Sequence, residues 1–278
     1  MTSFISLEDH FIGQAVKDRP SATAIPSHLW PTSIWTDLYD VGEKRITAMD
    51  KGDISLQIVS HIPAVEPPEL CRKVNDQLYE AVKNSKGRLR GFAFVPLGDP
   101  SAVPEELERC VRQLGFVGAL IPNHAHGRYF DDEDYWPMFG KAEELDVPIY
   151  IHPTPAADFG RFQGNYPEDI ATLLSGPALG WHHDIAENAV RMYASGLFDR
   201  YPRVKIIIGH MGEGIPFMLD RIDRFLTRRG KDKKARSFKQ VWNDNFWVTL
   251  SGMWSLDPFA CLIRNTAMDR ILYSMISS

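Results

Sequence analysis

The sequence predicts an α/β protein of the (β/α)8 class, a TIM-type barrel, that lacks the final helix of such a barrel. Short, nearly continuous apolar runs alternate with longer amphipathic segments along the whole chain. The apolar runs are typical of strands covered on both faces, and the amphipathic segments are typical of the helices that join them. The apolar runs number eight, and eight such units favour a closed barrel over an open doubly wound sheet. No Gly-rich phosphate-binding motif follows the first run, which also disfavours the open sheet.

Each apolar run predicts one strand. The strand candidates are residues 4–8, 54–62, 89–96, 117–123, 147–153, 204–210, 245–252 and 270–275. Apolar residues at helical spacing predict the helices between them. The helix candidates are residues 35–50, 69–85, 103–114, 133–145 and 213–229. Two stretches, 11–34 and 154–180, are predicted to be long loops after the first and fifth strands, at the end of the barrel where active sites are built.

The last strand candidate is followed by only three residues, Ile276, Ser277 and Ser278. A barrel of this class normally ends in an eighth helix that covers its last strand. We therefore expect the edge of that strand to be partly uncovered, or covered by a second copy of the chain. The 278 residues are expected to form a single domain.

Composition excludes several kinds of partner. The formal net charge of -5 leaves no basic face for nucleic acid. Cys71, Cys110 and Cys261 are too few and too scattered for a disulfide framework or a Cys-rich zinc site. No apolar stretch reaches the roughly 18 residues that a membrane span needs, and the N-terminus does not read as a signal peptide. We expect a cytoplasmic protein.

Three polar clusters stand where predicted strands end, which is where a barrel places its functional residues. Glu8 and His10 close the first strand, His152 the fifth and His210 the sixth, with Glu213 close behind. Two residues apart on a regular strand, the side chains of Glu8 and His10 project on one face. Imidazole and carboxylate groups that converge from separate elements are the ligands of a metal site. The sequence therefore predicts a metal-dependent active site.

Further polar and aromatic residues fall in the loops predicted at the same end. They are Phe11, His124, His182, His183 and Trp254, and they are candidates for contacts with a small-molecule substrate. The alternative for each is structural: a polar loop for His124, a helix cap for His182 and His183, and a small satellite core for the aromatic residues.

Three segments resemble one known family. They are ISLEDHF at 5–11, ELDVPIYIHP at 144–153 and GLFDRYPRVKIIIGHMGEGIPFMLDRID at 196–223. The chain resembles the metal-dependent decarboxylases related to the amidohydrolases, which act on 2,3- and 2,6-dihydroxybenzoate, salicylate and similar phenolic acids. The last segment is the most specific of the three, and the resemblance extends from residue 4 to about residue 275.

The resemblance implies a non-oxidative decarboxylase, a carboxy-lyase, of an ortho-hydroxy aromatic acid. Glu8, His10 and His152 would be metal ligands, and His210 with Glu213 would be the catalytic acid–base pair. The metal would be Zn²⁺ in the first place, with Mn²⁺ or Mg²⁺ as alternatives. The family also implies a homodimer or homotetramer, and an aromatic acid as the substrate.

The chain departs from the family at its last strand. There the family continues into an Asp that binds the metal and carries a proton, whereas Ile276 stands at or next to that position here and no acidic residue follows Asp269. Two further hypotheses therefore stay open. One is a metal-dependent hydrolase of the lactonase type, with water in the vacated ligand position. The other is a truncated, inactive pseudoenzyme.

Overall fold

The computed structural model describes residues 3–19, 32–226 and 236–274. The chain divides into two compact units: unit 1 contains Met1–Ile121 and Tyr273–Ser278, and unit 2 contains Pro122–Leu272. No helix among the described residues is both long and apolar enough to cross a lipid bilayer. That the chain forms a single domain stays a prediction.

Unit 1 is built on three parallel strands that pair in the order β1-β2-β3. The strands are β1 (Phe4–Phe11), β2 (Ile54–His61) and β3 (Leu89–Gly91), and the first three residues of β4 (Ala119–Pro122) also belong to this unit. Its helices are η1 (Gln14–Val16), α1 (Thr32–Leu38), α2 (Glu43–Lys51), α3 (Pro68–Asn84) and α4 (Val103–Arg112). Leu7 of β1 also forms a parallel bridge with Ser274, so the end of the described chain pairs with its first strand.

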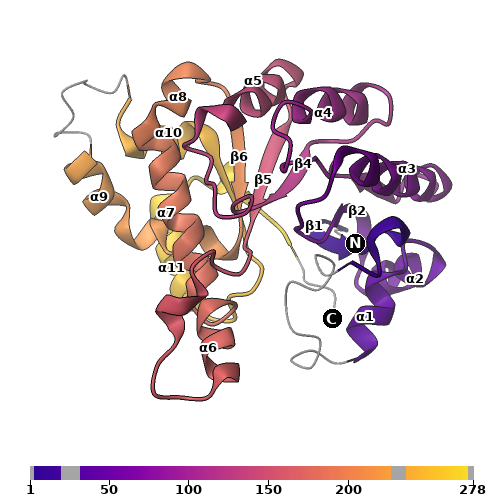
Figure 1. The fold of residues 1–278 in the computed structure, drawn as a ribbon, viewed down its shortest axis with the longest axis horizontal. Coiled ribbons are helices and arrows are strands. Elements are labelled where there is room, and N and C mark those ends of the chain that lie inside the picture. The colour runs from indigo at the N-terminus through magenta and orange to yellow at the C-terminus, as the bar shows by residue number, and fades with distance from the viewer. Residues whose placement is uncertain (1–2, 20–31, 227–235, 275–278) are drawn as a thin grey trace. The chain divides into compact units, whose positions relative to one another are not determined.

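Unit 2 contains four parallel strands in the order β5-β6-β7-β8. They are β5 (Pro148–His152), β6 (Lys205–Ile208), β7 (Phe246–Thr249) and β8 (Ile271–Leu272). The α-helices are α5 (Trp136–Leu145), α6 (Glu168–Ser175), α7 (Gly180–Ser195), α8 (Leu197–Arg200), α9 (Ile215–Leu226), α10 (Phe238–Asn245) and α11 (Leu256–Asn265). Short 3-10 turns are η4 (Glu133–Tyr135), η5 (Phe159–Phe162), η6 (His210–Gly212) and η7 (Met268–Arg270). Helices α5, α7 and α10 lie around β5 and β6 (Figure 1).

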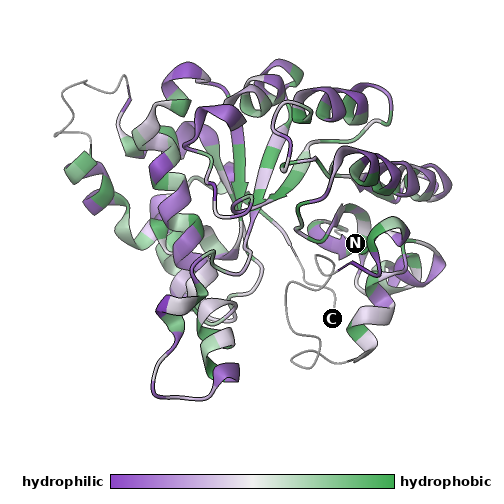
Figure 2. Ribbon diagram, viewed as in Figure 1, coloured by the Kyte–Doolittle hydropathy of each residue, from purple (hydrophilic) through white to green (hydrophobic). Residues whose placement is uncertain are grey.

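The core of unit 2 follows from its sequence. The strands β5 and β6 are among the most hydrophobic parts of the ribbon, whereas the helices alternate hydrophobic and hydrophilic residues (Figure 2). Helix α10 begins at a capping box, in which Ser237 and Gln240 satisfy each other's backbone N–H groups. The indole of Trp242 in this helix is fully buried and stacks on the ring of Phe246 at 5.3 Å. This packing fixes β7 against the helix that precedes it.

All eight predicted strands are present, and most helices lie where the periodicity places them. The predicted third strand, 89–96, is shorter, because only Leu89–Gly91 pairs as a strand. The predicted helix 35–50 is two helices, because the side chain of Asp40 accepts the N–H of Gly42 and forms a turn between them.

The prediction of an irregular stretch over 154–180 was wrong, because it contains η5 and the whole of α6. Helix α6 has only eight residues, and Pro167 before it and Gly176 after it mark it as a short element between turns. Such a segment is too short for periodicity to separate it from a loop. The loop predicted over 11–34 lies partly outside the described residues. So does Ile276, and the absence of a final helix stays a prediction.

Strand β1 is irregular at Glu8. The pairing with β2 shifts between Leu7 and Asp9, and Glu8 itself has a φ of 77°. Glu8 is thus an extra residue in the pairing of β1 with β2, a β-bulge, which bends the strand and interrupts the regular ladder. The expectation that Glu8 and His10 share a face assumed a regular strand, and that the two side chains share a face stays a prediction.

Replacing Trp242 with Phe is expected to lower the melting temperature by roughly 4–8 °C. The smaller ring leaves a void, and the hydroxyl of Thr266 loses the indole N–H that it accepts at 3.0 Å. Together these losses lower the free energy of unfolding by about 2 kcal/mol. The matched control is Trp254→Phe, because the side chain of Trp254 is 94% exposed. Differential scanning calorimetry measures both, and equal shifts would contradict the packing described for Trp242.

Candidate active site

The chain takes a left-handed turn directly after β6. Five successive residues, 210–214, have φ values of 49°, 54°, 85°, 56° and 80°, and the N–H of Gly212 closes the turn on the carbonyl of Gly209 at 2.8 Å. Each non-glycine residue in this conformation costs roughly 1–2 kcal/mol. Three of the five, His210, Met211 and Glu213, have side chains. Strain of this kind persists where surrounding contacts enforce it and is concentrated at functional sites.

This turn brings His210 and Glu213 together in the interior of unit 2. The Nδ1 atom of His210 lies 2.7 Å from Oε1 of Glu213, and their side chains are 7% and 0% exposed. Burial acts to raise the pKa of Glu213, but the charge of His210 and hydrogen bonds from two histidines outweigh it, and the pKa lies below its usual value. The pair is thus an imidazole held by a buried carboxylate, the arrangement of a general acid or base.

A second imidazole contacts the same carboxylate. Nδ1 of His182, near the start of α7, lies 2.6 Å from Oε2 of Glu213, and its ring is edge-on to that of His210 with centroids 4.6 Å apart. The indole N–H of Trp181 donates to Nε2 of His182 at 3.0 Å. Glu213 therefore lies between two histidines, one on each carboxylate oxygen.

The three side chains His182, His210 and Glu213 are close enough to hold a metal ion, but their distances indicate hydrogen bonds. Two ligands bound to one zinc at about 2.0–2.1 Å in a tetrahedron lie roughly 3.3 Å apart. The nitrogen–oxygen distances here are 2.6 and 2.7 Å, which suit N–H donors facing a carboxylate. We interpret the cluster as an acid–base group.

Gly252, in the loop after β7, packs against the ring of His210. A Cβ placed on Gly252 would lie 2.5 Å from Cδ2 of His210, and the φ of Gly252 is 71°. Both the space and the backbone conformation therefore require glycine here. The sequence gives no signal for this contact, since a glycine in a loop is ordinary. The ring of His152 also lies edge-on to that of His210, with centroids 6.2 Å apart.

The predicted metal ligands divide between the two units. Glu8 and His10 belong to unit 1 and His152 to unit 2, and that the three meet at one ion stays a prediction. Nδ1 of His152 lies 2.8 Å from the carbonyl of Pro153. Because a carbonyl only accepts, this nitrogen carries the proton and the lone pair of the ring is on Nε2.

His10 is held in a similar way. Its Nδ1 atom lies 3.0 Å from the hydroxyl of Ser60, and its carbonyl accepts from the guanidinium of Arg45 at 2.6 Å. A second protein oxygen on the far nitrogen is the usual support of a metal-binding histidine. Glu8 adds a buried carboxylate, so the chemistry of this donor set fits a divalent metal.

Of the five candidates for substrate contact, only His182 lies in the cluster around Glu213. His124 joins two loops, because it contacts the carbonyl of Pro155 after β5 and accepts the N–H of Gly127 in its own loop. His183 is exposed and Trp254 is 94% exposed. Phe11 is fully buried in unit 1, and that these four residues touch a substrate stays a prediction.

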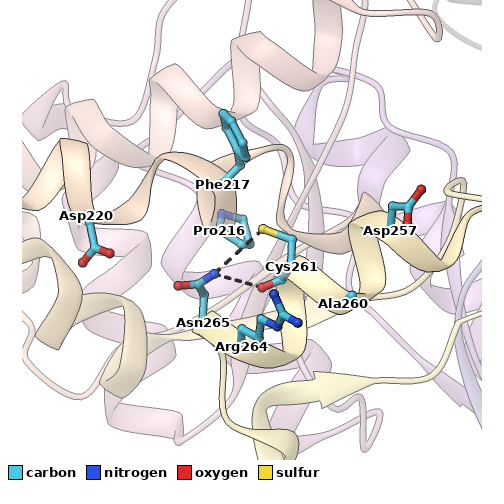
Figure 3. Close-up of a pocket in the computed structure, with 8 residues that line it drawn as sticks. All are labelled: Pro216, Phe217, Asp220, Asp257, Ala260, Cys261, Arg264 and Asn265. Carbon is cyan, nitrogen blue, oxygen red and sulfur yellow. Dashed lines mark hydrogen bonds between the residues drawn. The ribbon is translucent and has the colours of Figure 1, made fainter.

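A pocket of about 550 Å³ lies between α9 and α11 (Figure 3). It is lined by Pro216, Phe217, Asp220, Asp257, Ala260, Cys261, Arg264 and Asn265. The amide of Asn265 donates to the carbonyl of Cys261 at 2.9 Å (Figure 3). No histidine lines this pocket, and it includes none of the residues clustered around Glu213, so we do not assign it to the active site.

A family model described as amidohydrolase matches residues 55–274. The decarboxylase orsB of Emericella nidulans is 43% identical over 98% of this chain and 84% of its own length. The chain belongs to the amidohydrolase family. A gamma-resorcylate decarboxylase of Polaromonas sp. is 36% identical to this amidohydrolase over 99% of this chain and 87% of its own.

Solved structures show the same relationship. A dihydroxybenzoic acid decarboxylase from Polaromonas sp., with bound manganese and the inhibitor 2-nitroresorcinol, has a TM-score of 0.83 and 35% identity. The match covers 99% of this chain and 86% of that one. The predicted α/β fold class and the family resemblance are therefore confirmed.

Replacing Gly252 with Ala is expected to displace the ring of His210 and to destabilise the protein by about 2–4 kcal/mol. The left-handed backbone contributes roughly 1–2 kcal/mol, and the collision with the imidazole adds a comparable overpacking cost. Gly87→Ala is the matched control, because Gly87 has a φ of 87° with nothing within 4 Å of the added Cβ. Urea denaturation measures both, and equal losses of unfolding free energy would argue against contact with His210.

Proposed function

We propose that this chain is a metal-dependent, non-oxidative decarboxylase of an ortho-hydroxy aromatic carboxylic acid. The observation that carries the proposal is the buried His210–Glu213 pair in a chain whose relatives at 36–43% identity, over nearly its whole length, are named decarboxylases. The solved relatives include one with an inhibitor built on resorcinol and one with 2,6-dihydroxybenzoate, which supports a hydroxylated aromatic ring as the substrate.

The reaction needs a proton at the ring carbon that carries the carboxylate. In the proposed mechanism the imidazolium of His210 gives its Nε2 proton to that carbon, because its Nδ1–H is engaged with Glu213 at 2.7 Å. The bond to the carboxylate then breaks, CO₂ leaves, and the electron pair of that bond restores the aromatic ring. The negative charge of Glu213 stabilises the imidazolium before the transfer.

We propose Glu8, His10 and His152 as the ligands of a divalent metal, on the basis of the sequence resemblance and their donor chemistry. When bound, the metal would supply Lewis acidity and hold the carboxylate and the phenolic oxygen of the substrate. Zinc was the first expectation from the sequence, whereas two solved relatives contain bound manganese. Both ions accept imidazole and carboxylate ligands, and zinc itself stays a prediction.

Replacing Glu213 with Gln is expected to lower kcat for CO₂ release by about 10²–10⁴-fold with little change in KM. The amide keeps the shape of the carboxylate but cannot stabilise the imidazolium, so the acid catalysis of His210 is lost. The measurement is CO₂ release and resorcinol formation from 2,6-dihydroxybenzoate, with salicylate, 2,3-dihydroxybenzoate and benzoate compared. Glu187→Gln, on the exposed face of α7, is the matched control.

Unchanged turnover in Glu213→Gln would contradict the role of the pair. CO₂ release from benzoate as fast as from salicylate would contradict the requirement for an ortho hydroxyl. Ring opening of lactones without any CO₂ release from these acids would favour the hydrolase that the sequence left open. No reaction with either class would favour the inactive form.

Metal analysis by inductively coupled plasma mass spectrometry is expected to find close to one Mn²⁺ or Zn²⁺ per chain. His152→Ala should reduce the metal content at least about tenfold, because it removes one imidazole ligand. His126→Asn is the control, since this exposed residue has a φ of 51° that Asn tolerates. Full CO₂ release after removal of all bound metal with a chelator would overturn the metal dependence.

A further inference from the structure

We propose that His182 is a positioning residue for the acid–base pair: it holds the second oxygen of Glu213, so that the first oxygen faces His210. The proposal rests on the proposed function for its effect on catalysis. It rests on the geometry for the placement itself, in which Nδ1 of His182 and Nδ1 of His210 lie 2.6 and 2.7 Å from the two oxygens of one carboxylate.

The direction of the hydrogen bonds follows from Trp181. An indole N–H only donates, and it lies 3.0 Å from Nε2 of His182, so that nitrogen accepts. A neutral imidazole that accepts at Nε2 carries its proton on Nδ1, and His182 therefore donates to Oε2 of Glu213. The carbonyl of Pro177, at 3.2 Å from the same Nε2, is the longer of the two contacts.

The carboxylate depends on both imidazoles. The side chain of Glu213 is completely buried, and the hydrogen bonds described to its two oxygens come from His182 and His210. A buried charged oxygen that loses its donor is strongly destabilised. Without the His182 donor, the carboxylate would be free to turn and to share both oxygens with His210, which changes the direction of the bond that orients the imidazole.

The backbone around His182 is held in place independently of Glu213. Two residues further along α7, the carboxylate of Asp184 accepts from Asn123 and from the hydroxyl of Tyr129, both at 2.7 Å. At the start of the helix, a Cβ on Gly180 would lie 2.4 Å from the carbonyl oxygen of Ser175, so the helix begins in close contact with the preceding turn. His182 is thus presented to Glu213 by a fixed helix end.

The experiment compares two substitutions of His182 by steady-state kinetics. His182→Leu removes the donor, and it is expected to lower kcat by about 10–100-fold and to lower the melting temperature, with KM and metal content close to wild type. His182→Asn keeps an N–H donor at the position of Nδ1 and is expected to recover kcat to within about tenfold of wild type. Glu187→Gln, on the exposed face of the same helix, controls for changes to α7.

The pH profile adds a readout that general loss of packing would not move. In His182→Leu, loss of the donor raises the pKa of Glu213, so the acidic limb of kcat should move to higher pH, and His182→Asn should return it. An unchanged kcat in His182→Leu, or failure of His182→Asn to restore it, would overturn the proposal.

Histidine ¹⁵N spectra of the Zn²⁺-loaded protein test the placement without catalysis. The His182 resonances, assigned by their loss in His182→Asn, are expected to be those of the Nδ1–H tautomer. An Nε2–H tautomer would overturn the inference. If the wild type released no CO₂ from any of the acids but kept the Nδ1–H tautomer, the proposed function would fail while the placement of His182 stood.

Discussion

The buried carboxylate of Glu213 is the constraint on which the described centre of unit 2 depends. A charge removed from water is tolerated only when it is paired and hydrogen-bonded. Here each oxygen has one imidazole donor, from residues 31 and 3 positions away in the chain. The start of α7 and the turn after β6 must therefore both stay where they are, since movement of either would leave a buried oxygen without its donor.

The left-handed turn at 210–214 is how the chain satisfies this constraint. A right-handed helix starting at His210 would place Glu213 one turn along the same face, but the strained turn instead directs Nδ1 of His210 onto Oε1 at 2.7 Å. Glycine at 212 and 214 reduces the conformational cost, because glycine has no Cβ and adopts a positive φ without a steric clash. The remaining strain is carried by His210, Met211 and Glu213, and contacts such as that of Gly252 with the imidazole hold it in place.

Much of the fold and part of the site could be predicted from sequence, and the difference has a physical cause. Apolar runs such as Lys205–Ile208 mark a buried strand by themselves, and the strand end then locates His210 and Glu213. The contact of His182 with Glu213 could not be predicted from a strand end, because it forms only when the start of α7 packs beside the end of β6 in the folded chain. The same holds for Gly252, whose contact with His210 exists only in the folded chain. At Glu8 the strand has a bulge, which an argument from regular alternation cannot foresee because it assumes an uninterrupted strand.

The hydrogen-bond partners of His182 also bear on whether the cluster of His182, Glu213 and His210 can conduct protons. A chain of hydrogen-bonded groups moves protons only if each member can both give and take one. At Nε2 of His182 the neighbours are the indole of Trp181 and the carbonyl of Pro177, and the first only donates while the second only accepts. Neither group can pass a proton onward, so among the described side chains the path from His210 through Glu213 stops at His182. These contacts favour a role for the second imidazole in holding the carboxylate of Glu213 over a role in conducting protons.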